Sequence, residues 1–315
     1  MLTSTTKLTT QLNSIQFSTL RGKSPLPPSN NSLVLNWVHG YASSSRGSVR
    51  YTETGKIAYF AASLGVVMTP PAKRKRSEGK SQMFNFSHSD DVTCMATCGS
   101  VIASGEVGKK PVIQIWDPTT IVTLHTLSGF HKRGISNLAF SADSTLLLSI
   151  GEDDEHSIAI YDWKNDKLRL SSKGDKSKIL DAKFDPSDNT KFVTVGVKHV
   201  KFWSVQGTNV GGKKGILGKL GKLQPFMCCE FVGKDLVVGT ADGKIYRFVG
   251  NVLKKVIDAH TKGVNTFFKT PNFQLISGSK DGTISFFDAS LNKTKTLSMV
   301  EIHKGIFRGG VKSVR

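Results

Sequence analysis

Long apolar runs and cysteines are both scarce in this chain. No stretch of about 18 apolar residues exists, so the sequence predicts no transmembrane helix. Four of the 315 residues are cysteine, too few for a disulfide framework, and this usage fits a reducing cytosol. Cys94 and Cys98 are close in sequence, but no second cysteine or histidine pair follows at a zinc-finger spacing. We therefore expect neither a metal nor a cofactor.

Motifs that carry catalysis are also missing. The sequence has no P-loop, no G-x-S-x-G elbow and no H-E-x-x-H pair. Acidic pairs occur at Asp90 and Asp91 and within 152–155, yet both sites are expected to be loops. General acid–base catalysis would need such groups to converge on a pocket, and nothing in the sequence places them there. We expect no catalytic residue and no enzymatic activity.

Acidic residues are few relative to basic ones. The chain has 24 Asp and Glu against 43 Lys and Arg, a formal charge of +19. Such a charge favours nucleic acid, an anionic membrane surface or an acidic protein as a partner. Residues 1–32 are expected to be a disordered basic tail rich in Ser, Thr and Pro. Their composition is also compatible with an organelle transit peptide.

The sequence does contain a repeated strand ending. Five segments end in the same apolar–aromatic pattern at intervals of 39 to 45 residues, and their aromatic positions are Trp116, Tyr161, Trp203, Phe248 and Phe287. This period is typical of WD-type β-propeller blades, each of which is a four-stranded sheet. We expect blades at about 84–127, 128–172, 175–210, 223–258 and 260–300, together spanning 84–302. Residues 303–315 are expected to begin a further blade.

The histidines recur with the blades. His88, His131, His260 and His303 each precede the expected first strand of a blade. In WD repeats, a histidine, a strand serine and a turn aspartate form a buried hydrogen-bonded network, here His260, Ser277 and Asp281. Burying such groups without partners costs about 1–3 kcal/mol each, so we interpret them as structural. Phe287 stands where the network usually ends in tryptophan, which predicts a weaker network.

Two basic segments are candidate partner-binding sites. The first is Lys73, Arg74, Lys75 and Arg76, which fits a nuclear-localisation or nucleic-acid patch, or a solvated loop between strands. The second lies within 206–229, a stretch without any acidic residue, and comprises Lys213, Lys214, Lys219 and Lys222 interleaved with Ile216, Leu217, Leu220 and Leu223. It fits a docking loop for an acidic protein surface or a mobile connector between blades.

The segment before the blades resembles a known motif. Residues 35–41 (LNWVHGY) and 54–67 (TGKIAYFAASLGVV) resemble the HELP motif of echinoderm microtubule-associated protein-like proteins. The likeness continues through the blades to about residue 300. It implies a HELP segment at 33–70, whose fold would be set mainly by Trp37, Gly40, Tyr41, Tyr59 and Gly65. It also implies binding to microtubules or soluble tubulin.

Together these features predict an all-β WD-repeat β-propeller with an N-terminal HELP segment. Five blades, the HELP strands and part of a sixth blade do not close a ring of seven, so we expect the ring to be incomplete. The expected function is non-catalytic binding of tubulin or microtubules, in the cytoplasm and on the cytoskeleton, with other proteins on the propeller faces. A membrane or nucleic-acid partner is not expected. The alternative is a WD-repeat scaffold in a nucleic-acid–protein assembly such as ribosome biogenesis.

Overall fold

The computed structural model describes residues 34–43, 45–70, 81–272, 274–302 and 309–314. Nearly all regular structure in these ranges is antiparallel β-sheet. Within them, no helix is both long and apolar enough to cross a membrane. The strands form six units of four, which we call sheets 1 to 6 in chain order.

Sheets 1 to 3 make up the N-terminal half of the fold. Sheet 1 contains β1 (Val49–Tyr51), β2 (Ile57–Ala61), β3 (Leu64–Met68) and β4 (Gln82–Asn85). Sheet 2 contains β5 (Val92–Cys98), β6 (Val101–Gly108), β7 (Ile113–Trp116) and β8 (Thr123–Leu127). Sheet 3 contains β9 (Arg133–Phe140), β10 (Leu146–Gly151), β11 (Ile158–Asp162), the short 3-10 helix η1 (Trp163–Asn165) and β12 (Lys167–Ser172). The ends of β6 and β9 also pair, which joins sheets 2 and 3.

Sheets 4 to 6 make up the C-terminal half. Sheet 4 contains β13 (Ile179–Asp185), β14 (Asp188–Gly196), β15 (His199–Gln206) and β16 (Asn209–Lys214). Sheet 5 contains β17 (Phe226–Val232), β18 (Asp235–Thr240), β19 (Lys244–Val249) and β20 (Val252–Asp258). Sheet 6 contains β21 (Val264–Lys269), β22 (Leu275–Ser279), β23 (Thr283–Phe287) and β24 (Lys293–Ser298), followed by α2 (Met299–Ile302).

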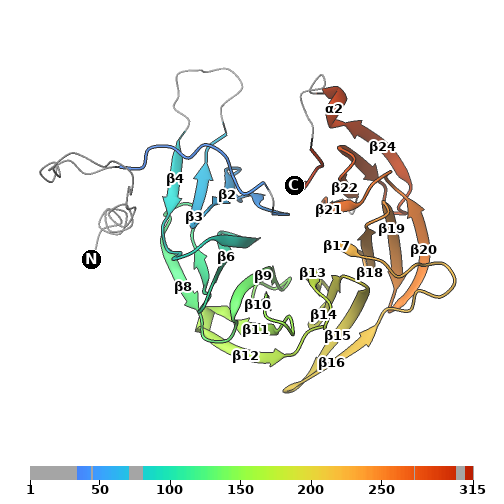
Figure 1. The fold of residues 1–315 in the computed structure, drawn as a ribbon, viewed down its shortest axis with the longest axis horizontal. Coiled ribbons are helices and arrows are strands. Elements are labelled where there is room, and N and C mark those ends of the chain that lie inside the picture. The colour runs from blue at the N-terminus through green and yellow to red at the C-terminus, as the bar shows by residue number, and fades with distance from the viewer. Residues whose placement is uncertain (1–33, 44, 71–80, 273, 303–308, 315) are drawn as a thin grey trace, which may run out of the picture.

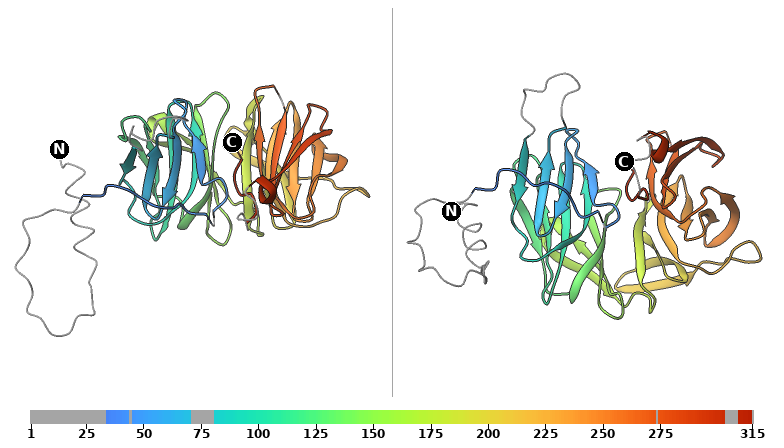
Figure 2. Two further views of the ribbon diagram at one scale, coloured as in Figure 1. Left: turned by 90° about the horizontal axis from the view of Figure 1, so that it is seen from above. Right: turned by 45° about the horizontal axis from the view of Figure 1, so that its top comes forward.

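The six sheets stand side by side around a central channel, like blades of a propeller (Figure 1). Side views show the strands running roughly along the channel, with an opening between the first and last sheets (Figure 2). The prediction of an all-β, incomplete propeller is therefore confirmed. The expectation that residues 84 and 85 begin the first blade is wrong, because β4 pairs with β3 and completes a four-stranded sheet 1.

The repeated aromatic residues hold neighbouring sheets together. Each is at most 4% exposed and packs into an apolar cluster with the preceding sheet. Trp116 of sheet 2, for example, lies against Ala58 and Phe60 of sheet 1. Because sheets pack face to face through side chains that alternate along each strand, one large aromatic per blade fills the space between two blades. This packing explains why the sequence repeats at this period.

Residues 309–314 run along the channel side of the opening (Figure 1). The backbone N–H of Val311 donates to the carbonyl of Ser279 of sheet 6 at 2.7 Å. On the other side, the N–H of Gly47 donates to the carbonyl of Lys312 at 3.4 Å, and the Ser313 hydroxyl donates to the Val49 carbonyl at 3.3 Å. This segment therefore joins the last sheet to the first at the hub.

Val311 fills a recurrent position. It lies over Gly278, as Val264 lies over Gly239 in the preceding pair of sheets. A cavity of about 560 Å³ borders this segment, lined on one side by Tyr41 and Tyr51 and on the other by residues such as Ile284 and Met299. The opening is thus bridged at the channel and hollow farther out.

Candidate interaction surface

The structure describes only one of the two predicted basic segments. Lys73, Arg74, Lys75 and Arg76 lie outside the described residues. The second segment is described throughout, and we call residues 213–224 the basic strap. The sequence predicts a loop at Lys213 and Lys214, but both residues belong to β16, which pairs with β15 along its whole length.

Backbone hydrogen bonds fix the first half of the basic strap. The N–H of Gly215 donates to the carbonyl of Val200 at 2.8 Å. Ile216 then forms a parallel bridge with Val252 of β20. The N–H of Ile216 donates to the carbonyl of Asn251 at 2.7 Å, and the carbonyl of Ile216 accepts from the N–H of Leu253 at 2.9 Å. The strap therefore crosses from the outer strand of sheet 4 to that of sheet 5.

Tyr246 of sheet 5 anchors the second half. Its hydroxyl accepts a hydrogen bond from the backbone N–H of Lys222 at 2.9 Å and another from the Gln224 side chain at 3.4 Å. Gly221 passes so close that a Cβ there would lie 2.6 Å from Leu253 and 3.1 Å from the Tyr246 ring. A larger residue there would have to displace the Leu253 side chain. The strap thus begins in sheet 4, and sheet 5 holds it at Ile216 and again at Lys222, an arrangement that favours a docking segment over a mobile connector.

The outward side of the basic strap combines positive charge with apolar surface. Its four lysines are exposed, and among the described residues none of them forms an ion pair. Leu217 packs into the core between sheets 4 and 5, whereas Ile216, Leu220 and Leu223 are 52%, 61% and 63% exposed. Arranged in this way, the strap can attract carboxylates and also bury apolar groups.

Burial and the positive charge of the strap both lower the pKa of the neighbouring Lys201. Lys201 of β15 lies over the ring of Trp203, with its Nζ 3.7 Å from the ring centroid. Burial lowers its pKa, Asp175 raises it, and the nearby positive charge of Lys214 lowers it again.

The residues expected to set the HELP fold lie in or beside sheet 1. The Tyr59 hydroxyl accepts a hydrogen bond from Gln82 at 2.6 Å, and Gln82 also exchanges hydrogen bonds with the backbone of Val38. A Cβ on Gly65 would lie 2.9 Å from the ring of Trp116. These contacts tie the segment before β1 to sheet 1, and sheet 1 to sheet 2.

The remaining HELP residues are less enclosed. Trp37 is half-buried, with its ring centroid 6.1 Å from that of His39. Gly40 has a φ of +93°, a conformation that favours glycine. Tyr41 is 53% exposed and lines the cavity at the opening. Their proposed role in the fold of this segment remains a prediction.

The predicted histidine network of sheet 6 contains one further member. The Nε2 of His260 lies 2.6 Å from the Ser277 hydroxyl, and its Nδ1 lies 2.7 Å from the hydroxyl of Thr283. Thr283 in turn donates to Asp281 at 2.6 Å. The sequence pattern missed Thr283, although its place two residues after the turn aspartate could have indicated it.

Related networks in the other sheets use different partners. In sheet 2, His88 lies between Ser104 at 2.7 Å and Glu106 at 2.9 Å, and the Trp116 indole donates to Ser104 at 3.0 Å. Glu106 was not foreseen, because it lies on strand β6 and not in a turn. In sheet 3, the two ring nitrogens of His131 contact Ser149 and Ser157.

Burial determines the charge of these histidines. It lowers the pKa of His131 to about 4, despite the opposing effect of Asp153. It likewise lowers the pKa of His260 to about 4, opposed by Asp281 and assisted by Lys293. Both rings are therefore neutral near pH 7 and serve as hydrogen-bonding links between strands.

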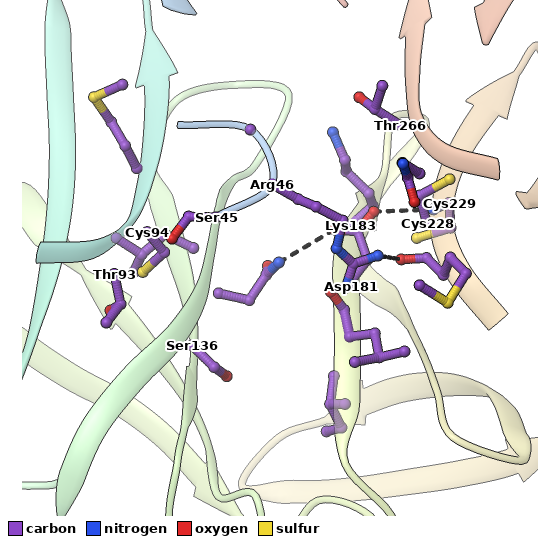
Figure 3. A pocket seen from close by; sticks show the side chains of 18 of the residues that line it. Ser45, Arg46, Thr93, Cys94, Ser136, Asp181, Lys183, Cys228, Cys229 and Thr266 are labelled. Atoms are coloured by element: carbon purple, nitrogen blue, oxygen red, sulfur yellow. Dashed lines mark hydrogen bonds between the residues drawn. The ribbon is translucent and has the colours of Figure 1, made fainter. Parts of the chain in front are cut away.

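The central channel holds a second polar cluster that sequence reasoning did not find. Arg46, from the segment before β1, reaches across the channel and donates to the carbonyls of Leu180 and Met227 (Figure 3). Asp181 accepts hydrogen bonds from Asn137 at 3.2 Å and from the backbone N–H of Cys229 at 2.9 Å. A cavity of about 330 Å³ surrounds these groups. The cluster connects sheets 3, 4 and 5 to the N-terminal segment.

The cysteines offer little chemistry. Burial raises the pKa of Cys94 to about 12 and also raises the pKa values of Cys228 and Cys229. Cys228 and Cys229 point to opposite faces of β17, as their adjacent positions predict. Such thiols stay protonated and act as small apolar residues.

Comparisons with known proteins identify the architecture. A family model described as the first β-propeller of echinoderm microtubule-associated protein matches residues 81–312, and a HELP motif model matches residues 27–66. The β-propeller domain of Cps50 (Swd1) from Myceliophteria thermophila has a TM-score of 0.56 and 18% identity. It covers 62% of this chain and 65% of that chain, and at this identity it supports the fold alone.

Curated relatives share the same region. Echinoderm microtubule-associated protein-like 2 of Rattus norvegicus is 30% identical over 298 residues, which are 89% of this chain and 44% of the rat protein. The 77 kDa echinoderm microtubule-associated protein of Lytechinus variegatus is 28% identical over 299 residues, 90% of this chain and 44% of that protein. The chain thus spans less than half the length of these relatives.

Proposed function

Because the chain belongs to the echinoderm microtubule-associated protein family, we propose that it binds tubulin or microtubules without catalysing a reaction. It would act in the cytoplasm, on the cytoskeleton, with its propeller faces open to further protein partners. The names of the relatives support a microtubule-associated role, and the formal charge of +19 supports an acidic partner.

The basic strap is the observation that carries this proposal. Lys213, Lys214, Lys219 and Lys222 are exposed on a backbone that sheets 4 and 5 already hold in place. Tubulin carries acidic tails, and positive groups arranged on a fixed surface attract such tails and steer their approach. A fixed strap also loses little conformational freedom on binding. The strap would therefore be the main point of electrostatic attraction.

Co-sedimentation with polymerised tubulin tests the proposal. We expect the wild-type chain to pellet with microtubules, and to pellet less as salt is raised, because screening shortens the range of the attraction. Microtubules whose acidic tails have been cleaved should retain less protein. Reversal of the four strap lysines to Glu should weaken binding at least about tenfold, as expected when several like charges face an acidic surface.

A matched variant controls for the general loss of positive charge. Reversing the exposed Lys109, Lys110, Lys132 and Lys167, which belong to sheets 2 and 3 and their loops, changes the net charge by the same amount. It should weaken binding less than the strap variant does. Absence of co-sedimentation, together with tight binding of RNA, would refute the proposal and favour the nucleic-acid–protein scaffold.

A further inference from the structure

We infer that the basic strap binds an acidic peptide segment that also carries apolar side chains. This inference rests on the proposed function, and it adds the chemistry of the partner segment. Lysines on a polar surface would be enough for a purely electrostatic site. The basic strap instead has lysines next to large apolar side chains that are exposed to solvent in the free protein.

The apolar part consists of the exposed side chains of Ile216, Leu220 and Leu223, which we call the ridge. All three side chains are more than half exposed, although Leu217 in the same segment is packed into the core. The alternation shows that the strap already satisfies its own packing through Leu217. The ridge residues are therefore free to contact a partner, and covering them would remove apolar surface from water.

The position of the lysines determines what can cover the ridge. Lys219 directly precedes Leu220, and Lys222 directly precedes Leu223. A partner that reaches either leucine therefore comes within reach of an ammonium group. Since no acidic residue occurs between Gln206 and Cys229, a carboxylate of the partner meets no competing negative charge on the strap. The complementary segment alternates acidic and apolar residues.

The ridge continues onto sheet 5. The N–H of Ile216 donates to the carbonyl of Asn251, in the turn between β19 and β20, and Val249 at the start of that turn is 45% exposed. The strap thus reaches the outer rim of the propeller beside β20 (Figure 1). A peptide lying across it would contact two connected elements.

A narrow peptide matches this surface because the lysines and the exposed apolar side chains lie within one short segment, residues 213–223. The nearby carboxylate of Asp258 is already paired with Lys244, with Nζ and Oδ1 2.8 Å apart. The exposed Lys254 and Lys255 of β20 add positive charge beside the strap. Binding of anionic vesicles is therefore the competing outcome of a binding test. A nucleic acid would use the lysines and leave the leucine ridge exposed.

Peptide binding measured by fluorescence anisotropy tests the inference. The probe is a labelled glutamate-rich peptide containing two leucines, compared with the same peptide carrying serine in their place. We expect the leucine peptide to bind at least about tenfold more tightly, the difference that about 1.4 kcal/mol of apolar burial provides. Equal affinity for the two peptides would overturn the inference.

Paired variants locate the site. Leu220→Ser with Leu223→Ser should remove the preference for the leucine peptide, and Lys219→Gln with Lys222→Gln should weaken both peptides. Because the four side chains are exposed, the fold should tolerate both changes. Val122→Ser with Lys109→Gln, at exposed positions of sheet 2, is the matched control and should bind like wild type. Stronger binding of anionic vesicles than of the leucine peptide, abolished by the same strap variants, would overturn the inference.

Microtubule co-sedimentation of the same variants separates this inference from the proposed function. If wild type fails to pellet, the proposed function fails, whatever the peptides show. If wild type pellets and the leucine-to-serine variant pellets equally well, the function stands and the apolar site is refuted. Weaker pelleting of that variant, with wild-type behaviour of the control, supports both.

Discussion

Two buried histidines should make the fold sensitive to mild acid. His131 and His260 both have a pKa of about 4 in the folded protein, against 6.5 when exposed. The unfolded chain therefore takes up protons at a higher pH than the folded chain does. Their contribution to stability is present above pH 6.5 and is lost as the pH falls from 6.5 towards 4.

The size of the effect follows from these pKa values. Between pH 7 and pH 5, each histidine should lower the free energy of unfolding by about 2 kcal/mol, so the pair should lower it by about 4 kcal/mol. Burial also lowers the pKa of His199, which adds to the loss in the same direction. The carboxylate of Asp281 does not titrate between pH 7 and pH 5. Burial alone would raise its pKa, but hydrogen bonds from Thr283 and Thr261 lower it to about 2.

Urea denaturation at pH 7, 6 and 5 measures this loss, with circular dichroism as the signal. The His131→Gln and His260→Gln variants each lack one titrating ring, so each should show a shallower dependence on pH, whatever its stability at pH 7. A free energy of unfolding that changes by less than about 1 kcal/mol between pH 7 and pH 5 would refute the reasoning.

Three further predictions concern single contacts. Gly65→Ala should destabilise the fold by about 1–3 kcal/mol in denaturant unfolding, because the new methyl group would press on the buried Trp116 ring. Trp116→Phe should cost about 1 kcal/mol or more through loss of the bond to Ser104, while Phe287→Leu, at a site without an indole donor, should show only a packing loss. Tyr246→Phe should leave the fold intact but speed hydrogen exchange at the Lys222 amide; unchanged exchange would show that the hydroxyl does not hold the strap.

Much of the fold could be predicted because the propeller repeats one local rule. An aromatic residue at a fixed place in each blade fills the space against the preceding sheet, so spacing alone locates Trp116, Trp203 and their equivalents. The fourth strand of sheet 1 could not be found in this way. β4 begins well after β3 ends, and it carries no member of the repeat.

The candidate site was predictable only in part. The absence of acidic residues in 206–229 indicated a basic surface, and residue types alone indicated the apolar component. Which apolar residues face solvent depends on contacts with Tyr246 and Leu253, which are distant in sequence. In the same way, the channel position of Arg46 depends on the carbonyls of Leu180 and Met227, and no local pattern encodes such contacts.

The join between the first and last sheets has a mechanical consequence. Ser313 and Val49, whose contact spans 264 positions of sequence, form part of the joint that couples sheet 6 to sheet 1 across the opening. Each of the five other sheet boundaries contains an apolar cluster, whereas among the residues that the structure describes this one is held by a few hydrogen bonds and Val311. Under a pulling force applied across the arc, the joint should part first. The six sheets, still held together at their five other boundaries, would then form an open arc that can widen while each sheet stays folded.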